Sequence, residues 1–70
     1  MANHQENVAD DLLRGVPAIA EFIGESPRQT YDLLETERVP GFKLGGKIWY
    51  ASKTRLRHHY ARLAANPEAA

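Results

Sequence analysis

Apolar residues recur at helical spacing in two neighbouring stretches of the chain. The first stretch is "VPAIAEFI", residues 16–23. Its apolar positions repeat every three or four residues, which places them on one face of a helix: Val16, Ile19, Ala20 and Ile23. Pro17 is tolerated in a first turn, and Gly24 is typical of the residue that ends a helix. The pattern predicts a short helix over 16–23.

The second stretch, "GESPRQTYDLL", has a well-defined helix start. Ser26 is a suitable N-cap, Pro27 suits the first turn, and Gln29 completes an S-x-x-Q capping box. The apolar side of the predicted helix, residues 27 to about 37, is formed by Thr30, through its methyl group, Leu33 and Leu34. The remaining positions fall on or near the outer surface: Arg28, Gln29, Tyr31, Asp32 and Glu35.

A β-hairpin is predicted after this helix, in "RVPGFKLGGKIWYA". Strand-forming residues flank Gly45 and Gly46, which is a turn signal. A two-residue loop would mix polar and apolar side chains on each face. A three-residue loop over 45–47 instead gives one wholly apolar face by pairing Leu44 with Ile48 and Phe42 with Tyr50. That register puts Lys47 at the tip and turns Lys43 and Trp49 outward.

A last helix is expected to begin after Ser52, a plausible N-cap, and to end at Pro67. Its apolar stripe consists of Leu56, Tyr60 and Leu63. This helix either closes the core or presents its basic outer face to DNA or a second protomer, and the first role is favoured. The predicted organisation is a flexible segment over 1–11, one domain over 12–64 that Leu12 and Leu13 anchor, and a tail over 65–70.

Composition limits the classes of protein that fit. The chain has 70 residues and no cysteine, so its core is small and neither disulfides nor thiolate metal sites support it. His58 and His59 are adjacent and would point about 100° apart on a helix, so no metal site is expected. No catalytic constellation or phosphate-binding glycine loop is present, and we expect neither an enzyme nor a cofactor. No apolar run could cross a bilayer, which predicts a soluble, cytoplasmic protein without a membrane partner.

Charge is strongly polarised along the chain, although the formal net charge is zero. Residues 1–37 carry eight acidic and two basic side chains, whereas residues 38–67 carry seven basic and no acidic ones. The basic residues are interleaved with Trp49, Tyr50 and Tyr60. This mixture favours a surface that faces nucleic-acid phosphates over an ordinary solvated surface.

Together these elements predict a mainly α fold with a small β-hairpin, arranged as a winged helix-turn-helix. The second helix of such a motif offers its N-terminal residues to base edges in the major groove. Arg28 can donate two hydrogen bonds to guanine, and Gln29 can pair with adenine. The predicted contacts to double-stranded DNA are made by Ser26, Arg28, Gln29, Tyr31, Asp32, Arg38, Lys43, Lys47, Trp49, Lys53 and Arg55.

The segment from "IAEFIGESPRQTYDLL" to "VPGFKLGGKIWYASKTRL" resembles the MerR-like, excisionase-type winged helix-turn-helix family over residues 12–64. The resemblance implies a small DNA-binding factor of a phage or mobile element. Such factors are recombination directionality factors that bind tandem sites cooperatively and bend DNA for an integrase, or transcriptional regulators. Two positions depart from the family pattern. Asp32 lies where many members carry a basic residue, and Trp49 lies where a wing arginine is common.

Other functions use similar surfaces. A transcriptional regulator or the DNA-recognition part of a phage packaging factor would be built in the same way. An adaptor that reads no DNA would instead dock on a protein, such as an integrase, through its acidic first half or through Trp49. Trp49 itself could pack within the hairpin, stack on a sugar and phosphate, or contact a partner, and packing is favoured.

Overall fold

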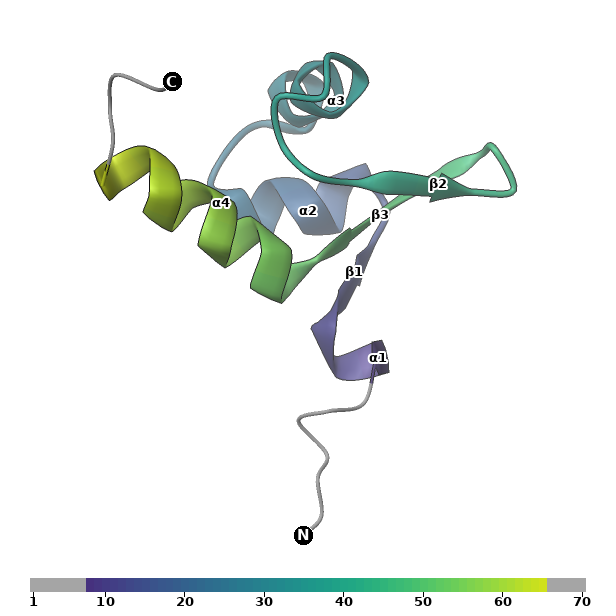
Figure 1. The fold of residues 1–70 in the computed structure, drawn as a ribbon. Coiled ribbons are helices and arrows are strands. Elements are labelled where there is room, and N and C mark those ends of the chain that lie inside the picture. The colour runs from purple at the N-terminus through teal and green to yellow at the C-terminus, as the bar shows by residue number, and fades with distance from the viewer. Residues whose placement is uncertain (1–7, 66–70) are drawn as a thin grey trace, which may run out of the picture.

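The computed structural model describes residues 8–65 and shows a mainly helical chain with a three-stranded antiparallel sheet (Figure 1). The helices and strands follow in the order α1 (Val8–Asp11), β1 (Leu12–Arg14), α2 (Val16–Ile23), α3 (Pro27–Glu35), β2 (Phe42–Leu44), β3 (Ile48–Ser52) and α4 (Lys53–Ala65). The helix predicted over 16–23 is confirmed at both ends. Most of the expected N-terminal segment and C-terminal tail, residues 1–7 and 66–70, lies outside the described residues.

A tight turn joins α2 and α3, and it is stabilised by a C-terminal cap on α2 and an N-terminal cap on α3. Gly24 ends α2 in the left-handed region, with φ 79°, and its N–H donates to the Ala20 carbonyl. Ser26 then caps α3, because its Oγ accepts a 3.1 Å hydrogen bond from the Gln29 N–H. The expected N-cap is therefore confirmed. α3 ends at Glu35, two residues before the predicted end, and Glu37 has a positive φ of 60°.

β3 is the central strand of the sheet, with β1 on one side and β2 on the other. The β1 strand was missed by the sequence analysis, which treated Leu12 and Leu13 only as an apolar anchor. Leu13 pairs with Ala51, and Arg14 pairs with Tyr50. A three-residue strand with two apolar residues carries too short a pattern to reveal alternation, and its partner residues lie 36 or more positions away.

The hairpin has the predicted register but the opposite orientation. Leu44 pairs with Ile48 and Phe42 with Tyr50, so the three-residue loop is confirmed. The prediction that Trp49 turns outward is wrong. Trp49 is half-buried and packs against the core, on the same side of β3 as the fully buried Ala51. The wholly apolar face therefore points away from the helices, and Phe42 and Leu44 are 43% and 55% exposed.

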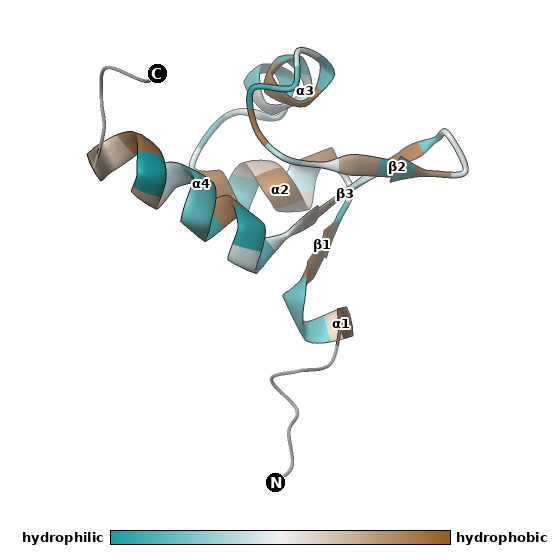
Figure 2. Cartoon of the chain, viewed as in Figure 1, coloured by the Kyte–Doolittle hydropathy of each residue, from teal (hydrophilic) through white to brown (hydrophobic). Residues whose placement is uncertain are grey.

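The core lies where α2, α3, β3 and α4 meet. Its buried members are Ile19, Leu34, Val39, Ala51 and Leu56. Figure 2 shows hydrophobic positions along α2 and a mixture of hydrophilic and hydrophobic positions along α3 and α4. The predicted α4 stripe is only partly buried, because Leu56 is fully enclosed but Tyr60 is 38% exposed. The second half of α4 extends past the other elements (Figure 1).

A hydrogen-bond cluster joins the start of the described chain to the start of α4. Ser52 caps α4, since its Oγ accepts a 3.2 Å bond from the Arg55 N–H. The Asp11 carboxylate also accepts bonds from the Ser52 hydroxyl, from the Thr54 N–H at 3.0 Å and from the Thr54 hydroxyl at 2.7 Å. Asp11 therefore acts as a second cap supplied from a distant part of the chain. These bonds, the Ser52 hydroxyl first among them, lower the pKa of Asp11 below its usual 3.8.

Candidate nucleic-acid interface

The first turn of α3 presents exposed polar side chains on a fixed backbone. Thr30 and Leu34 are buried on the inner side of the helix, while Arg28, Gln29 and Asp32 lie on the exposed side. The N-terminal turn is held by the Ser26 hydroxyl, whose lone pair is used by the Gln29 N–H. Ser26 therefore has a structural role that orders the residues after it. The side chains of Arg28 and Gln29 are exposed, and no described residue forms a side-chain hydrogen bond or ion pair with them.

Tyr31 and Arg38 flank the exposed side of α3. Tyr31 is 46% exposed. Arg38 follows the end of the helix, and it lines a small surface hollow together with Gln29 and Asp32. The Arg38 backbone is fixed, because its N–H donates a 2.8 Å hydrogen bond to the Leu33 carbonyl. The structure therefore places Arg38 beside the C-terminal half of α3, at a hollow that Gln29 and Asp32 also line.

The other predicted basic contacts come from two separate elements. Lys47 is exposed in the turn between β2 and β3, where Gly45 and Gly46 adopt positive φ values of 69° and 73°. Arg55 is exposed in the first turn of α4, whereas Lys53 is half-buried. An exposed guanidinium or ammonium group can bind a phosphate oxygen from any sequence. These positions can hold a nucleic-acid backbone but carry no base information.

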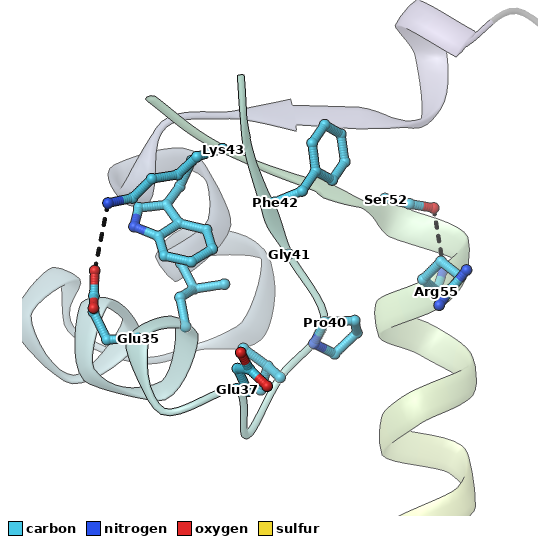
Figure 3. A pocket seen from close by; sticks show the side chains of 11 residues that line it. Glu35, Glu37, Pro40, Gly41, Phe42, Lys43, Ser52 and Arg55 are labelled. Atoms are coloured by element: carbon cyan, nitrogen blue, oxygen red, sulfur yellow. Dashed lines mark hydrogen bonds and ion pairs between the residues drawn. The ribbon is translucent and has the colours of Figure 1, made fainter. Parts of the chain in front are cut away.

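A half-open groove of about 800 Å³ lies between α3, the hairpin and the start of α4 (Figure 3). Lys43 extends along one side of this groove to Glu35, and their charged atoms are 3.5 Å apart. Arg55 lies on the opposite side, on α4. Trp49 and Leu34 also line the groove. Lys43 is thus already paired within the chain, whereas the exposed Lys47 forms no ion pair with any residue of 8–65.

Trp49 belongs to the packing of the fold. Its ring lies against the core, and a Cβ on Gly41 would be 3.4 Å from the Trp49 Cε3. The Lys43 ammonium lies 5.2 Å from the centre of the indole ring. Of the three roles considered for Trp49, the structure favours packing. Trp49 is half-buried, so it offers only part of its ring to any partner.

Charge on α3 itself does not favour phosphates. Arg28 is its only basic residue, whereas Asp32 and Glu35 are acidic. Arg28, Asp32 and Glu35 are spaced so that they share one side of the helix. Attraction to a polyanion must therefore come from the flanking residues, and α3 can contribute mainly selectivity.

Side chains that could ligate a metal ion are dispersed over residues 8–65. No group of three or more His, Cys, Asp or Glu side chains there is placed to hold a metal ion. The one other perturbed group is Tyr60, whose pKa is raised by burial and by the Glu25 carboxylate. In the same range, no helix is both long and apolar enough to cross a membrane.

Comparison with known proteins gives no relative. No family model, curated protein or solved structure matches the chain.

Proposed function

We propose that this protein binds double-stranded DNA sequence-specifically as a winged helix-turn-helix. In this proposal α2 and α3 form the helix-turn-helix, and the β2–β3 hairpin is the wing. The observation that carries the proposal is the first turn of α3, where the Ser26 cap fixes the backbone beneath the exposed Arg28 and Gln29. Both residue types can form two hydrogen bonds with a base edge in the major groove.

Backbone contacts supply the affinity in this account. Arg38 lies beside Gln29 and Asp32, Lys47 occupies the hairpin tip, and Arg55 begins α4. Each ammonium or guanidinium that meets a phosphate releases counterions and makes binding salt-dependent. Asp32 lowers attraction to phosphates but can accept a hydrogen bond from a cytosine amino group. Recognition therefore combines a few base contacts with separate cationic contacts on either side.

We further propose that the protein is an excisionase or a small regulator of a phage or mobile element. The resemblance of residues 12–64 to the MerR-like, excisionase-type family supports this finer assignment. A single module of this kind buries only about 600–1,000 Å² of its own surface on DNA. Selective occupancy then needs several copies on neighbouring sites, which agrees with cooperative self-association and with an integrase as an additional partner.

Selection of DNA fragments by the purified protein tests the proposal. Fragmented host genomic DNA and a randomised duplex library are bound at near-physiological salt, and the retained fragments are sequenced. We expect an enriched sequence of a few base pairs. Clustered repeats beside an integrase gene support an excisionase, and promoter sites support a regulator. Absence of any enriched sequence, with equal binding of all duplexes at low salt, contradicts DNA reading.

A protein-docking adaptor is the second candidate function. The observation that favours it is the outer face of the sheet, where Phe42 and Leu44 are exposed and no described element covers them. An apolar face of this kind is typical of a protein contact surface. The double substitution Phe42→Ser and Leu44→Ser discriminates between the two functions. It removes partner binding in an adaptor and leaves base preference unchanged in a DNA reader.

A further inference from the structure

Lys43 is held at the junction between α3 and the hairpin by two contacts. Its Nζ lies 3.5 Å from Glu35 Oε2 on α3 and 5.2 Å from the centre of the Trp49 ring on β3. The side chains of Lys43 and Glu35 are 34% and 42% exposed, so water screens the pair only in part. One side chain of β2 therefore contacts both its neighbouring strand and the helix (Figure 3).

The hairpin packs closely against α3 at Gly41, two residues before Lys43. A Cβ on Gly41 would lie 2.5 Å from Leu34 Cδ2 and 3.2 Å from the Tyr50 carbonyl oxygen. The chain therefore crosses over α3 at Gly41 without spare room. Lys43 lies two residues nearer the hairpin tip, where the outer sheet face is uncovered. A contact at this position limits how far the free end of the hairpin can swing relative to α3.

The same contact changes the charge of the exposed side of α3. Glu35 shares that side with Arg28 and Asp32, so an unpaired Glu35 would place a second carboxylate towards a bound polyanion. The Lys43 ammonium offsets this charge locally. The Lys43 ammonium is therefore already paired with the Glu35 carboxylate. Lys47 at the hairpin tip is exposed and forms no ion pair within the described residues.

We propose that Lys43 is a positioning residue that sets the angle between the wing and α3 and does not itself bind a phosphate. This inference rests on the proposed DNA-binding function. By bridging Glu35 and Trp49, Lys43 fixes the span from the base-reading turn at Arg28 to the phosphate-binding tip at Lys47. Lys43 thus contributes to the preference for one DNA sequence, whereas Lys47 contributes to the affinity for any duplex.

The test compares K43Q with K47Q, since each removes one positive charge from the hairpin. Affinities for the enriched site and for an unrelated duplex are measured over a range of salt concentrations. We expect K43Q to lower the preference for the site about two- to fivefold, the range of a partly exposed ion pair, with an unchanged salt slope. K47Q should lower the salt slope by about one unit with an unchanged preference.

Two further variants separate position from charge. K43R retains the cation and its contact with the ring, and it should keep the site preference. E35Q should lose preference as K43Q does but bind unrelated duplexes more tightly, because a negative charge is removed. If K43Q lowers the salt slope by about one unit and retains the preference, Lys43 is a phosphate contact and the inference is overturned. Unchanged binding in K43Q also overturns it.

Trp49 provides a readout that needs no DNA, because it is the only tryptophan in the chain. In the free protein, K43Q should change the indole emission, whereas K47Q should not. The destabilisations caused by K43Q and E35Q should be non-additive in thermal unfolding. If the wild-type protein prefers no duplex, the proposed function fails while this readout still tests the junction. Unchanged emission together with additive destabilisation contradicts the Lys43 bridge itself.

Discussion

Thr30 is a buried residue with an unsatisfied hydroxyl. It is 0% exposed, and its Oγ1 has no hydrogen-bond partner among the described residues. The helical spacing predicts Thr30 on the inner side of α3, and its burial confirms this. Burial of a hydroxyl without a hydrogen-bond partner costs free energy. The shape of the Thr30 side chain suits this buried position, whereas its hydroxyl destabilises the fold.

Thr30→Val should therefore stabilise the protein. Valine keeps the β-branched shape that suits this helix position and removes the unpaired hydroxyl. We expect the free energy of unfolding to rise by about 1 kcal/mol, measured by chemical denaturation. Thr30→Ser, which removes the methyl and keeps the hydroxyl, is the control and should be destabilising. A loss of stability in Thr30→Val would show that the hydroxyl has a partner.

Asp11 is the second informative residue, because it caps α4 across the fold. The sequence pattern predicts that it belongs to a flexible segment. The pair of acidic residues before "LL" gives no sign of a partner 43 positions away. A local sequence pattern could not predict these hydrogen bonds, because Asp11 reaches Thr54 only when β1 pairs with β3.

Stability should fall in acid through Asp11. The folded pKa lies below the unfolded value of 3.8, so its contribution is complete above pH 3.8 and is lost as the pH falls through the folded pKa. In Asp11→Asn, this part of the pH dependence should be absent. Chemical denaturation between pH 2 and 7 should show the difference between wild type and variant shrinking towards low pH. A constant difference argues against the depressed pKa.

At the scale of helices and strands, the sequence predicts those features that neighbouring residues determine. The α2 bounds, the Ser26 cap and the three-residue hairpin loop are confirmed because each follows from neighbouring residues. The orientation of the hairpin was mispredicted, since alternation defines two faces but does not say which one meets the core. Trp49 and Ala51 decide this by packing on the helices, which leaves the more uniformly apolar face exposed.

A substitution at Gly41 tests how closely the hairpin packs on α3. In Gly41→Ala the new Cβ would meet Leu34 Cδ2 at 2.5 Å, so the buried Leu34 side chain or the hairpin must shift. We expect a loss of about 1–3 kcal/mol in the free energy of unfolding, as for other overpacked sites. Gly45→Ala is an informative comparison, because it is strained by a positive φ but meets no atom within 4 Å. Partial recovery of Gly41→Ala by Leu34→Val would locate the strain at this contact.

At the scale of the whole molecule, the candidate site is assembled from three parts of the chain. The turn that we propose reads bases lies on α3, one cation lies at the hairpin tip, and others lie after α3 and at the start of α4. Sequence alone identified the types of residue, but it could not show that Lys43 pairs with Glu35 or that Trp49 packs inward. Those assignments depend on how the hairpin folds over α3, which is a tertiary property.

The most direct test of the central claim is the base preference of Arg28→Ala, measured over a randomised duplex library beside the wild-type protein. If the first turn of α3 reads DNA, the variant loses about 1–3 kcal/mol on the enriched site, and its preference relaxes at one or two adjacent positions. Binding to unrelated duplexes should change much less. An unaltered sequence preference, with affinity lowered equally on every duplex, would contradict base reading by Arg28.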